Sequence, residues 1–232
     1  MDRPWLFDES SHAGPEHFDS CFVSGYDRKQ GYPDPTEDLD IFARFGLGPT
    51  SAVIDLGAGT GQFALAAARR FGHVRAIDVS AQMLEFLSDR AAEANLANID
   101  CIRAGFLSYQ HDGPPADGVY TRNALHHLPD FWKAMALNRM ARIMRTGAVL
   151  RIHDLIYDFQ PSESERILDR WLDHAVEDPA EGYTRADFID HIRGEHSTFR
   201  WLLEPMLIAT SFQIVTAEFR GQVYGAYTCV KR

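Results

Sequence analysis

The sequence predicts an α/β fold in which a doubly wound, mostly parallel sheet is covered by helices, and three observations support this prediction. Short β-branched runs alternate with longer amphipathic stretches across residues 52–153, as in parallel strands joined by crossover helices. A glycine-rich loop, DLGAGTGQF, follows the first of these runs. The last two apolar runs are separated only by residues 220–222, which is too short for a crossover and indicates an antiparallel hairpin.

The first five strands and three helices follow from this alternation. The expected strands are Ala52–Leu56, Val74–Asp78, Ile99–Arg103, Asp117–Arg122 and Ala148–His153. The expected helices are Gly61–Phe71, Ala81–Asn95 and Phe131–Met144. Ser80 and Asp130 are suitable N-caps for the second and third helices, and the acidic Asp130 also interacts favourably with the helix dipole.

The alternation stops after the fifth strand, and residues 155–211 are expected to form a helical insert. A capping box at Ser162–Glu165 and an N-cap at Thr184 predict two helix starts, and FRWLLEPMLIAT predicts an apolar helix. Phe212–Phe219 and Val223–Val230 then form the hairpin. The turn-rich GYPDPT at residues 31–36 separates an N-terminal segment, residues 1–35, from the body of the domain, residues 36–232.

The composition fits one domain of 232 residues, and the cytoplasm is its expected location. Cys21, Cys101 and Cys229 are widely spaced and form no CxxC pair, which disfavours a disulfide framework. The formal charge of −10 disfavours a nucleic-acid partner, because a polyanion would be repelled. No secretory signal is recognised, and the longest apolar stretch falls short of the roughly 18 residues that span a bilayer, so no membrane partner is expected.

The glycine loop predicts a nucleotide-binding site at the end of the first strand. Gly57, Gly59 and Gly61 remove every second Cβ, so backbone amides can approach a ligand as the next helix begins. A dinucleotide fingerprint would need a third glycine at position 62, where this chain has Gln62, and no Gly-Lys-Ser/Thr follows for a phosphate loop. Asp78 ends the second strand, where its carboxylate can accept both hydroxyls of a ribose.

Three segments together resemble a known family. VIDLGAGTGQF, AIDVSAQML and GVYTRNALHHLPD, in this order and spacing, are similar to motifs of the class I S-adenosylmethionine-dependent methyltransferases. The resemblance implies a Rossmann-like, seven-stranded sheet of order 3-2-1-4-5-7-6 with S-adenosylmethionine as the cofactor. It also implies methyl transfer to an O, N or C atom of a small-molecule acceptor, and it is less specific for the substrate than for the fold.

The resemblance implies a set of cofactor-binding residues, namely Asp55, Gly57, Gly59, Gly61, Asp78, Val79, Met83, Phe106, Asn123 and Tyr26. The three glycines would pass beneath the methionine part, where Asp55 would support the loop or the ammonium group. Asp78 would hold the ribose, and Val79 and Met83 would flank the adenine. Met83 at this spacing equally suits packing in the helix core. Asn123 would lie near the methionine moiety.

One position departs from the family pattern. In relatives the third strand ends in a glycine followed by an acidic residue that binds the adenine amine, whereas this chain has Ala104-Gly105-Phe106. Phe106 cannot accept that hydrogen bond, so backbone groups and an aromatic face are expected to recognise the adenine. Tyr26 and Tyr32 lie in the N-terminal segment, which relatives use as a lid over the cofactor, and packing on the surface is the alternative for both.

His126, His127 and His153 are the candidate bases, because they lie at or just after the ends of strands four and five at the functional edge of the sheet. A packed or merely hydrogen-bonded role is the alternative for each of them. A base is needed only if the acceptor must lose a proton. No metal site is expected, since adjacent side chains diverge and zinc would need further ligands within reach. We expect one of the adjacent pair to face the cofactor pocket and the other to support the loop before Pro129.

Alternatives remain for the function and for the insert. A nicotinamide-dependent oxidoreductase is one rival, which Gln62 disfavours, and a non-catalytic S-adenosylmethionine-binding scaffold of the same fold is the other. The insert is either a cap over the substrate pocket or an interface of a homodimer. Its aromatic, histidine and methionine side chains are Trp171, His174, Tyr183, His191, His196, Phe199, Trp201 and Met206.

Overall fold

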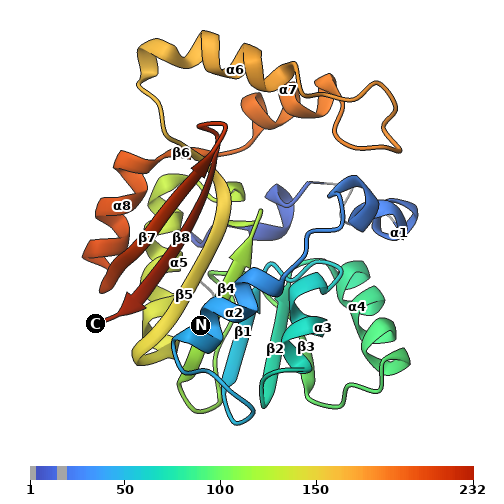
Figure 1. The fold of residues 1–232 in the computed structure, drawn as a ribbon, viewed down its shortest axis with the longest axis vertical. Helices are drawn as coiled ribbons and strands as arrows, with labels where there is room; N and C mark the ends of the chain where they lie inside the picture. Colours follow the sequence, from blue (N-terminus) through green and yellow to red (C-terminus); the bar gives the residue numbers. More distant parts are fainter. Residues whose placement is uncertain (1–3, 15–19) are drawn as a thin grey trace.

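The computed structural model describes residues 4–14 and 20–232, and one twisted sheet runs through it (Figure 1). Its strands in chain order are β1 (Ala52–Leu56), β2 (His73–Asp78), β3 (Ile99–Arg103), β4 (Ala116–Arg122), β5 (Met144–Tyr157), β6 (Thr198–Phe199), β7 (Phe212–Arg220) and β8 (Tyr224–Lys231). Seven of them follow the order β3-β2-β1-β4-β5-β8-β7, and β6 pairs with β5 off this path. The predicted order 3-2-1-4-5-7-6 is confirmed. The short β6 precedes the hairpin in the chain, so the two hairpin strands are numbered β7 and β8 here.

The pairing is parallel from β3 to β5 and antiparallel from β5 through β8 to β7, as the hairpin predicted. β1 and β3 have their predicted bounds. β5 is longer than expected at both ends. Its start pairs with β4 at Met144, and its last residues pair with β6, so the neighbouring strands extend it beyond its apolar run.

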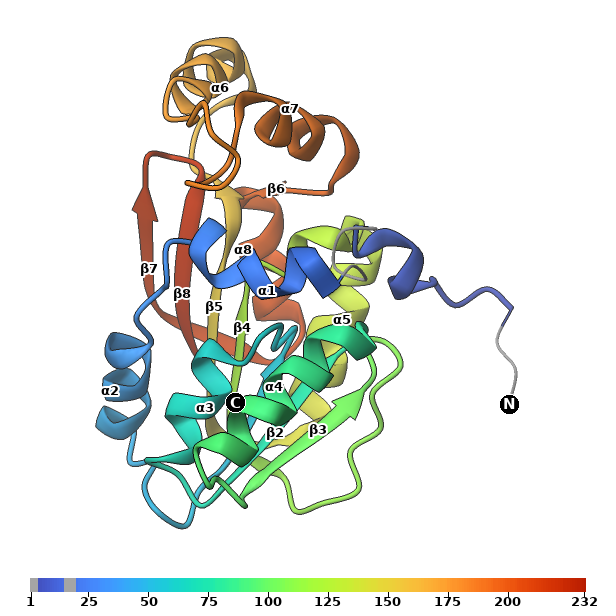
Figure 2. The ribbon, with the colours of Figure 1, turned by 90° about the vertical axis from the view of Figure 1, so that its right-hand side faces the viewer.

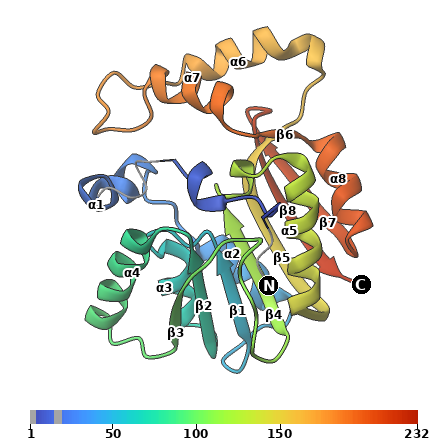
Figure 3. The same cartoon turned by 180° about the vertical axis from the view of Figure 1, so that it is seen from behind.

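Two groups of helices cover the two faces of the sheet (Figures 1 and 3). One face packs against α2 (Thr36–Arg44), α3 (Gln62–Ala68) and α4 (Ala81–Glu93). The other face packs against α5 (Asp130–Ile143) and α8 (Arg200–Ala209). Both faces bury apolar side chains, which explains why the central strands read as nearly continuous apolar runs.

Two predicted helix starts are confirmed. Ser80 caps α4, because its Oγ accepts a hydrogen bond from the Met83 amide at 3.1 Å. Thr184 begins α7 (Arg185–Gly194) with a capping box, in which the Asp187 carboxylate accepts from the Thr184 amide at 2.7 Å.

Two other predicted starts are wrong. Asp130 is already the first residue of α5, after Pro129, and its carboxylate accepts from Lys133 Nζ at 3.1 Å instead of capping the helix. The capping box expected at Ser162–Glu165 lies at Gln160–Glu163, since Pro161 takes the first position of the short helix η4 (Pro161–Glu163).

The insert between β5 and the hairpin has its own small core. It contains η4, α6 (Ser164–Leu172), α7 and β6 before α8 returns to the sheet. Trp171, Phe188 and Ile167 are buried in it together with the end of β5. Figure 2 shows α6 and α7 beyond the carboxyl ends of the parallel strands, with α1 (Ser20–Lys29) between them and the sheet. Among the described helices, none is long and apolar enough to cross a membrane.

Candidate active site

The glycine loop leaves β1 with three residues in left-handed backbone conformations, at φ 76° for Gly57, 51° for Gly59 and 85° for Gly61. A Cβ on Gly57 would lie 2.4 Å from the Cβ of Ala124, and one on Gly61 would lie 2.5 Å from Leu87 Cγ. Gly57 and Gly61 therefore permit close packing as well as an unusual backbone. A Cβ on Gly59 would meet no atom that closely, because the nearest one would be Tyr26 Cε1 at 3.8 Å.

Asp78 organises this loop from the end of β2. Its Oδ2 accepts a hydrogen bond from the Gly59 amide at 2.9 Å, and its Oδ1 accepts from the Ser80 amide at 2.8 Å. One carboxylate thus connects the glycine loop to the start of α4.

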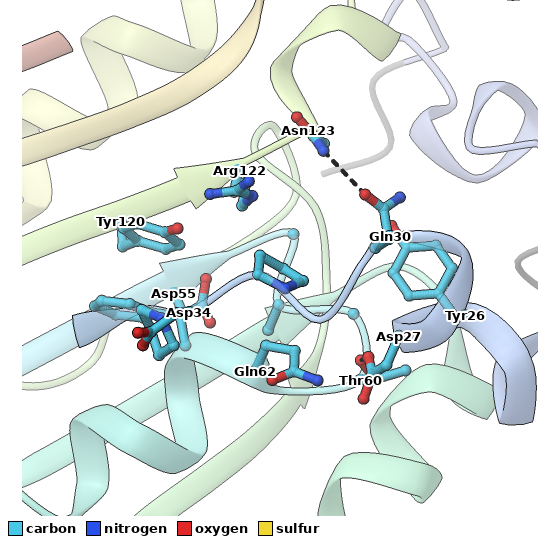
Figure 4. A pocket seen from close by; sticks show the side chains of 16 residues that line it. Tyr26, Asp27, Gln30, Asp34, Asp55, Thr60, Gln62, Tyr120, Arg122 and Asn123 are labelled. Atoms are coloured by element: carbon cyan, nitrogen blue, oxygen red, sulfur yellow. Dashed lines mark hydrogen bonds between the residues drawn. The ribbon is translucent and has the colours of Figure 1, made fainter. Parts of the chain in front are cut away.

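Two adjoining cavities open at this edge of the sheet. The larger, of about 650 Å³, is lined by Asp78, Val79, Met83 and Phe106 among others. The smaller, of about 560 Å³, is drawn in Figure 4 and has Asp55 in its wall. Both share the walls Tyr26, Gly57, Gly59, Arg122 and Asn123.

The structure brings nearly all of the predicted cofactor residues to these cavities. Gly61 is the exception, since it lines neither and packs against α4. Met83 is 1% exposed and packs in the core, and it also lines the larger cavity. Its position therefore suits both packing in the helix core and contact with the adenine. Asn123 has φ 48°, and its Nδ2 donates to Gln30 Oε1 at 3.2 Å (Figure 4).

Glu9, which the sequence did not single out, lies beside Phe106 in the wall of the larger cavity. Its Oε2 accepts from the amides of Leu107 at 3.0 Å and Ser108 at 3.2 Å. Its Oε1 is buried and makes no hydrogen bond within the described residues. Burial raises the pKa of Glu9 more than these amides lower it. The chain thus brings an acidic group to the adenine-binding end of the predicted site from the N-terminal segment.

The helix α1 lies over the glycine loop. Asp27 accepts from Arg90 of α4 at 2.8 Å and also bonds the hydroxyl of Thr60, the residue after Gly59. Tyr26 lines both cavities from the same helix, whereas Tyr32 is 62% exposed and packs on the surface. Residues 15–19 of the predicted lid segment lie outside the described part of the chain.

The same helix also contacts the insert. Lys29 Nζ lies 3.1 Å from Asp187 of α7 and 5.0 Å from the centre of the Tyr183 ring. Gln30 bonds the Tyr183 hydroxyl on one side and Asn123 on the other. Side chains of α1 therefore connect the end of β4 to the insert across the smaller cavity.

Asp55 places a buried carboxyl group in the wall of the smaller cavity. The side chain is 2% exposed, and burial together with the charge of Asp78 raises the pKa of Asp55 well above its ordinary value. Arg122 lines both cavities and is the cationic side chain at their shared wall. Figure 4 shows Asp55 and Arg122 from neighbouring strands around this cavity. A carboxyl group and a guanidinium group around one cavity suit a ligand that carries both a positive and a negative charge.

The adjacent histidines have different surroundings. His127 lines the larger cavity, whereas His126 is 5% exposed and points toward the insert. His126 Nδ1 lies 2.5 Å from Asp154 Oδ1, and its Nε2 lies 3.0 Å from Glu195 Oε2. Burial lowers the pKa of His126, but the two carboxylates outweigh it and raise the value to about 9.

The side chain of His153 lines neither cavity and is bonded to α2. Its Nε2 is 2.6 Å from Asp38 Oδ1, which also accepts from Arg151 Nε at 2.8 Å. The carboxylate of Asp38 accepts from the Tyr120 hydroxyl at 3.1 Å as well. His153 is thus part of a buried polar network under the sheet edge.

Fold and site together define a class of protein. A glycine loop after β1, an acidic residue at the end of β2 and a closing antiparallel hairpin are the arrangement of the class I S-adenosylmethionine-dependent methyltransferases. The model of a methyltransferase domain family matches residues 53–147 of this chain.

Two solved structures illustrate the likeness. The magnesium protoporphyrin IX methyltransferase of Synechocystis PCC 6803 with bound S-adenosylmethionine has a TM-score of 0.65 at 14% identity and covers 98% of this chain and 99% of its own. The [4+2]-cyclase SpnF has a TM-score of 0.62 at 18% identity and covers 84% of this chain and 80% of its own. At these identities the likeness concerns the fold.

A curated relative agrees with the domain match. Phosphoethanolamine N-methyltransferase 2 of Caenorhabditis elegans is 28% identical over 144 residues, which are 61% of this chain and 32% of that protein. The chain therefore spans about a third of the length of this relative.

Proposed function

We propose that the protein is an S-adenosylmethionine-dependent methyltransferase that acts on a small-molecule acceptor. The observation that carries this proposal is the cavity in which Asp78, bonded to the Gly59 amide, lies beside the open glycine loop. The methyltransferase domain match over residues 53–147 supports it independently.

The larger cavity holds the adenosine in this proposal. Asp78 lines this cavity, and its carboxylate accepts hydrogen bonds from the ribose hydroxyls. Val79, Met83 and Phe106 contact the adenine with apolar surface. Glu9 Oε1 accepts from the adenine amine and replaces the acidic residue that the third strand lacks.

The methionine part extends along the wall that both cavities share. Its ammonium group lies toward Asp55 and its carboxylate toward Arg122, because each charge then meets the opposite one. Asn123 contributes polar groups at the same wall. Gly59 supplies the open backbone beneath the ligand.

Methyl transfer needs the acceptor to approach the sulfonium in line, which positioning alone can accomplish. His127 is the histidine of the three that lines the cavity, and it contacts the acceptor in this proposal. His126 is bonded to Asp154 and His153 to Asp38, so in this proposal both histidines hold the surrounding structure in place and do not contact the acceptor. The helix α1 and the insert cover the site and exclude water, which strengthens electrostatic interactions inside it.

The insert is proposed to be a cap, supported by its contacts with α1 through Lys29 and Gln30. Amines are the first acceptors to test, since the curated relative is named as a phosphoethanolamine N-methyltransferase. We also propose that the protein works in the cytoplasm, supported by free thiols at Cys101 and Cys229; the side chain of Cys21 lies outside the described part.

Transfer from labelled donor to a panel of amines, alcohols and carbon acids, with phosphoethanolamine included, tests this proposal. His127→Gln should lower turnover while cofactor affinity stays within the error of the measurement, and the exposed His174→Gln should change neither. Cofactor binding without transfer to any member of the panel would favour the non-catalytic alternative.

A further inference from the structure

Three potential metal ligands converge where the insert meets the end of β4. His126, His127 and Glu195 each offer one ligand atom, and these atoms lie within 4.8 Å of one another. The histidines belong to the short helix η3 (Leu125–His127), and Glu195 follows α7. The expected divergence of adjacent side chains does not occur, because the tight turn of η3 brings the two rings to 4.3 Å between centres.

An outer carboxylate fixes the orientation of His126. Asp154 Oδ1 lies 2.5 Å from His126 Nδ1, and Asp154 Oδ2 accepts from the Leu125 amide at 2.8 Å and the His126 amide at 3.2 Å. A proton held on Nδ1 leaves Nε2 free to ligate, and a carboxylate in this role is typical of metal-binding histidines. Nε2 points to Glu195, whose Oε2 is 3.0 Å away.

The insert is held firmly at this point. The His196 amide donates to the His126 carbonyl at 2.9 Å, so the backbone itself joins the residue after Glu195 to η3. His191 of α7 bonds the Glu195 carboxylate, and its Nε2 lies 2.7 Å from Ser197 Oγ. The buried Lys133 donates to Asp130 and to the carbonyls of Leu128 and His196. The cluster is therefore rigid and carries net negative charge apart from its histidines.

We propose that His126, His127 and Glu195 form a binding site for a divalent transition-metal ion. Two imidazoles and one carboxylate are a ligand set that Zn²⁺ and related ions accept, and three protein ligands leave one coordination position open. His127 also lines the larger cavity, so the ion lies at the edge of that cavity. The ion joins the insert to the end of β4 and polarises a group that enters the open position.

The competing arrangement is a proton on His126 shared between Asp154 and Glu195. A proton would bridge those two carboxylates through His126 alone, whereas a metal ion would also engage His127, whose ligand atom lies within 4.8 Å of the other two. Metal binding can be measured without any methyl acceptor or cofactor, so its outcome is separate from that of the proposed transferase activity.

Titration of the chelator-treated full chain with Co²⁺, followed by visible absorption, and competition with Zn²⁺ test this site. We expect one equivalent to bind, and Glu195→Gln and His127→Gln each to weaken binding by more than about tenfold, the lower end of the cost of even an outer-shell substitution. The matched control His174→Gln removes an exposed histidine and should bind as the unaltered chain does.

Circular dichroism should establish that each variant is folded, and Glu195→Gln keeps the shape of a partly exposed side chain. The absence of saturable Co²⁺ or Zn²⁺ binding to the unaltered chain would overturn the proposal. An unchanged metal affinity in folded Glu195→Gln or folded His127→Gln would also overturn the proposal, because the three residues would then not bind one ion together.

Discussion

The carboxylate of Glu9 occupies the space that a side chain at position 105 would need, since a Cβ on Gly105 would lie 2.4 Å from Glu9 Oε1. The family pattern places its acidic residue just after this glycine, where the chain has Phe106. Glu9, 98 residues before Leu107 in the sequence, returns a carboxylate to the same corner of the cavity. Gly105 thus permits the N-terminal segment to complete the wall.

Glu9→Gln should reverse a preference between purine analogues. Because the amides of Leu107 and Ser108 need an acceptor, the glutamine oxygen takes that position and its NH2 group faces the cavity. We expect affinity for S-adenosylhomocysteine to fall by about 1.5 kcal/mol or more, the scale of a lost charged hydrogen bond. Affinity for the inosyl analogue, which has an oxygen in place of the amine, should rise.

Calorimetry with both ligands measures this change, and Glu85→Gln on the exposed side of α4 is the matched control. Equal losses for the two ligands would remove Glu9 from contact with the base.

Asp78→Ala should weaken binding of S-adenosylhomocysteine by on the order of 1.5 to 3 kcal/mol, because a charged acceptor for the ribose is lost. The same substitution frees the Gly59 amide, so the loop becomes less ordered. Calorimetry checks the affinity, with the exposed Asp89→Ala as the control on the same side of the molecule. Unchanged affinity would exclude Asp78 from the site.

Gly61→Ala should lower stability and leave cofactor affinity nearly intact. The residue has φ 85° and no room for a Cβ beside Leu87, so the free energy of unfolding should fall by at least about 1 to 2 kcal/mol, the cost of a left-handed non-glycine residue. Urea unfolding measures this, and Gly48→Ala, with open space around its Cβ position, is the control. A stable variant with weakened binding would instead assign Gly61 to the cofactor.

Asp38 should contribute stability that depends on pH. Burial alone would raise the pKa of Asp38, but His153 and Arg151 together lower it below its ordinary value of 3.8. A carboxyl whose pKa is lowered by folding stabilises fully above its ordinary pKa, and this contribution is lost as the pH falls below about 3.8 toward the folded-state value.

Asp38→Asn should therefore destabilise the protein at neutral pH by about 3 kcal/mol or more, since Arg151 is left buried without its charge partner. The difference from the unaltered protein should shrink below pH 3.8 in urea unfolding at several pH values. Asp40→Asn, whose ion pair with Arg70 is exposed, is the control. A difference that stays constant with pH would contradict the ionised state of Asp38.

The fold could be predicted because its main signals are local. β1 and β3 begin and end where their apolar runs do, and Ser80 and Thr184 cap helices with their own side chains. The extension of β5 and the two-residue β6 depend instead on pairing between distant segments, for which a local pattern has no signal. Pro161 did carry a local signal for the start of η4, which the capping box at Ser162–Glu165 obscured.

The residues of the candidate site could be predicted only where they belong to a recognisable sequence motif. The glycine loop, Asp78 and Asn123 belong to segments that adjoin the strand ends, and they line the cavities. Glu9 reaches the larger cavity from the N-terminal segment, and Glu195 reaches His126 from the insert. No spacing in the sequence relates either residue to β3 or β4. The orientation of His126 depends in turn on Asp154 and Glu195, which are also distant in the sequence.

Calorimetric titration of the purified chain with S-adenosylhomocysteine and, separately, with NAD tests the central claim most directly. The site described above predicts that S-adenosylhomocysteine binds with one equivalent per chain, that Asp78→Ala weakens it, and that NAD gives no saturable heat. Tight binding of NAD without binding of S-adenosylhomocysteine would contradict the proposed function.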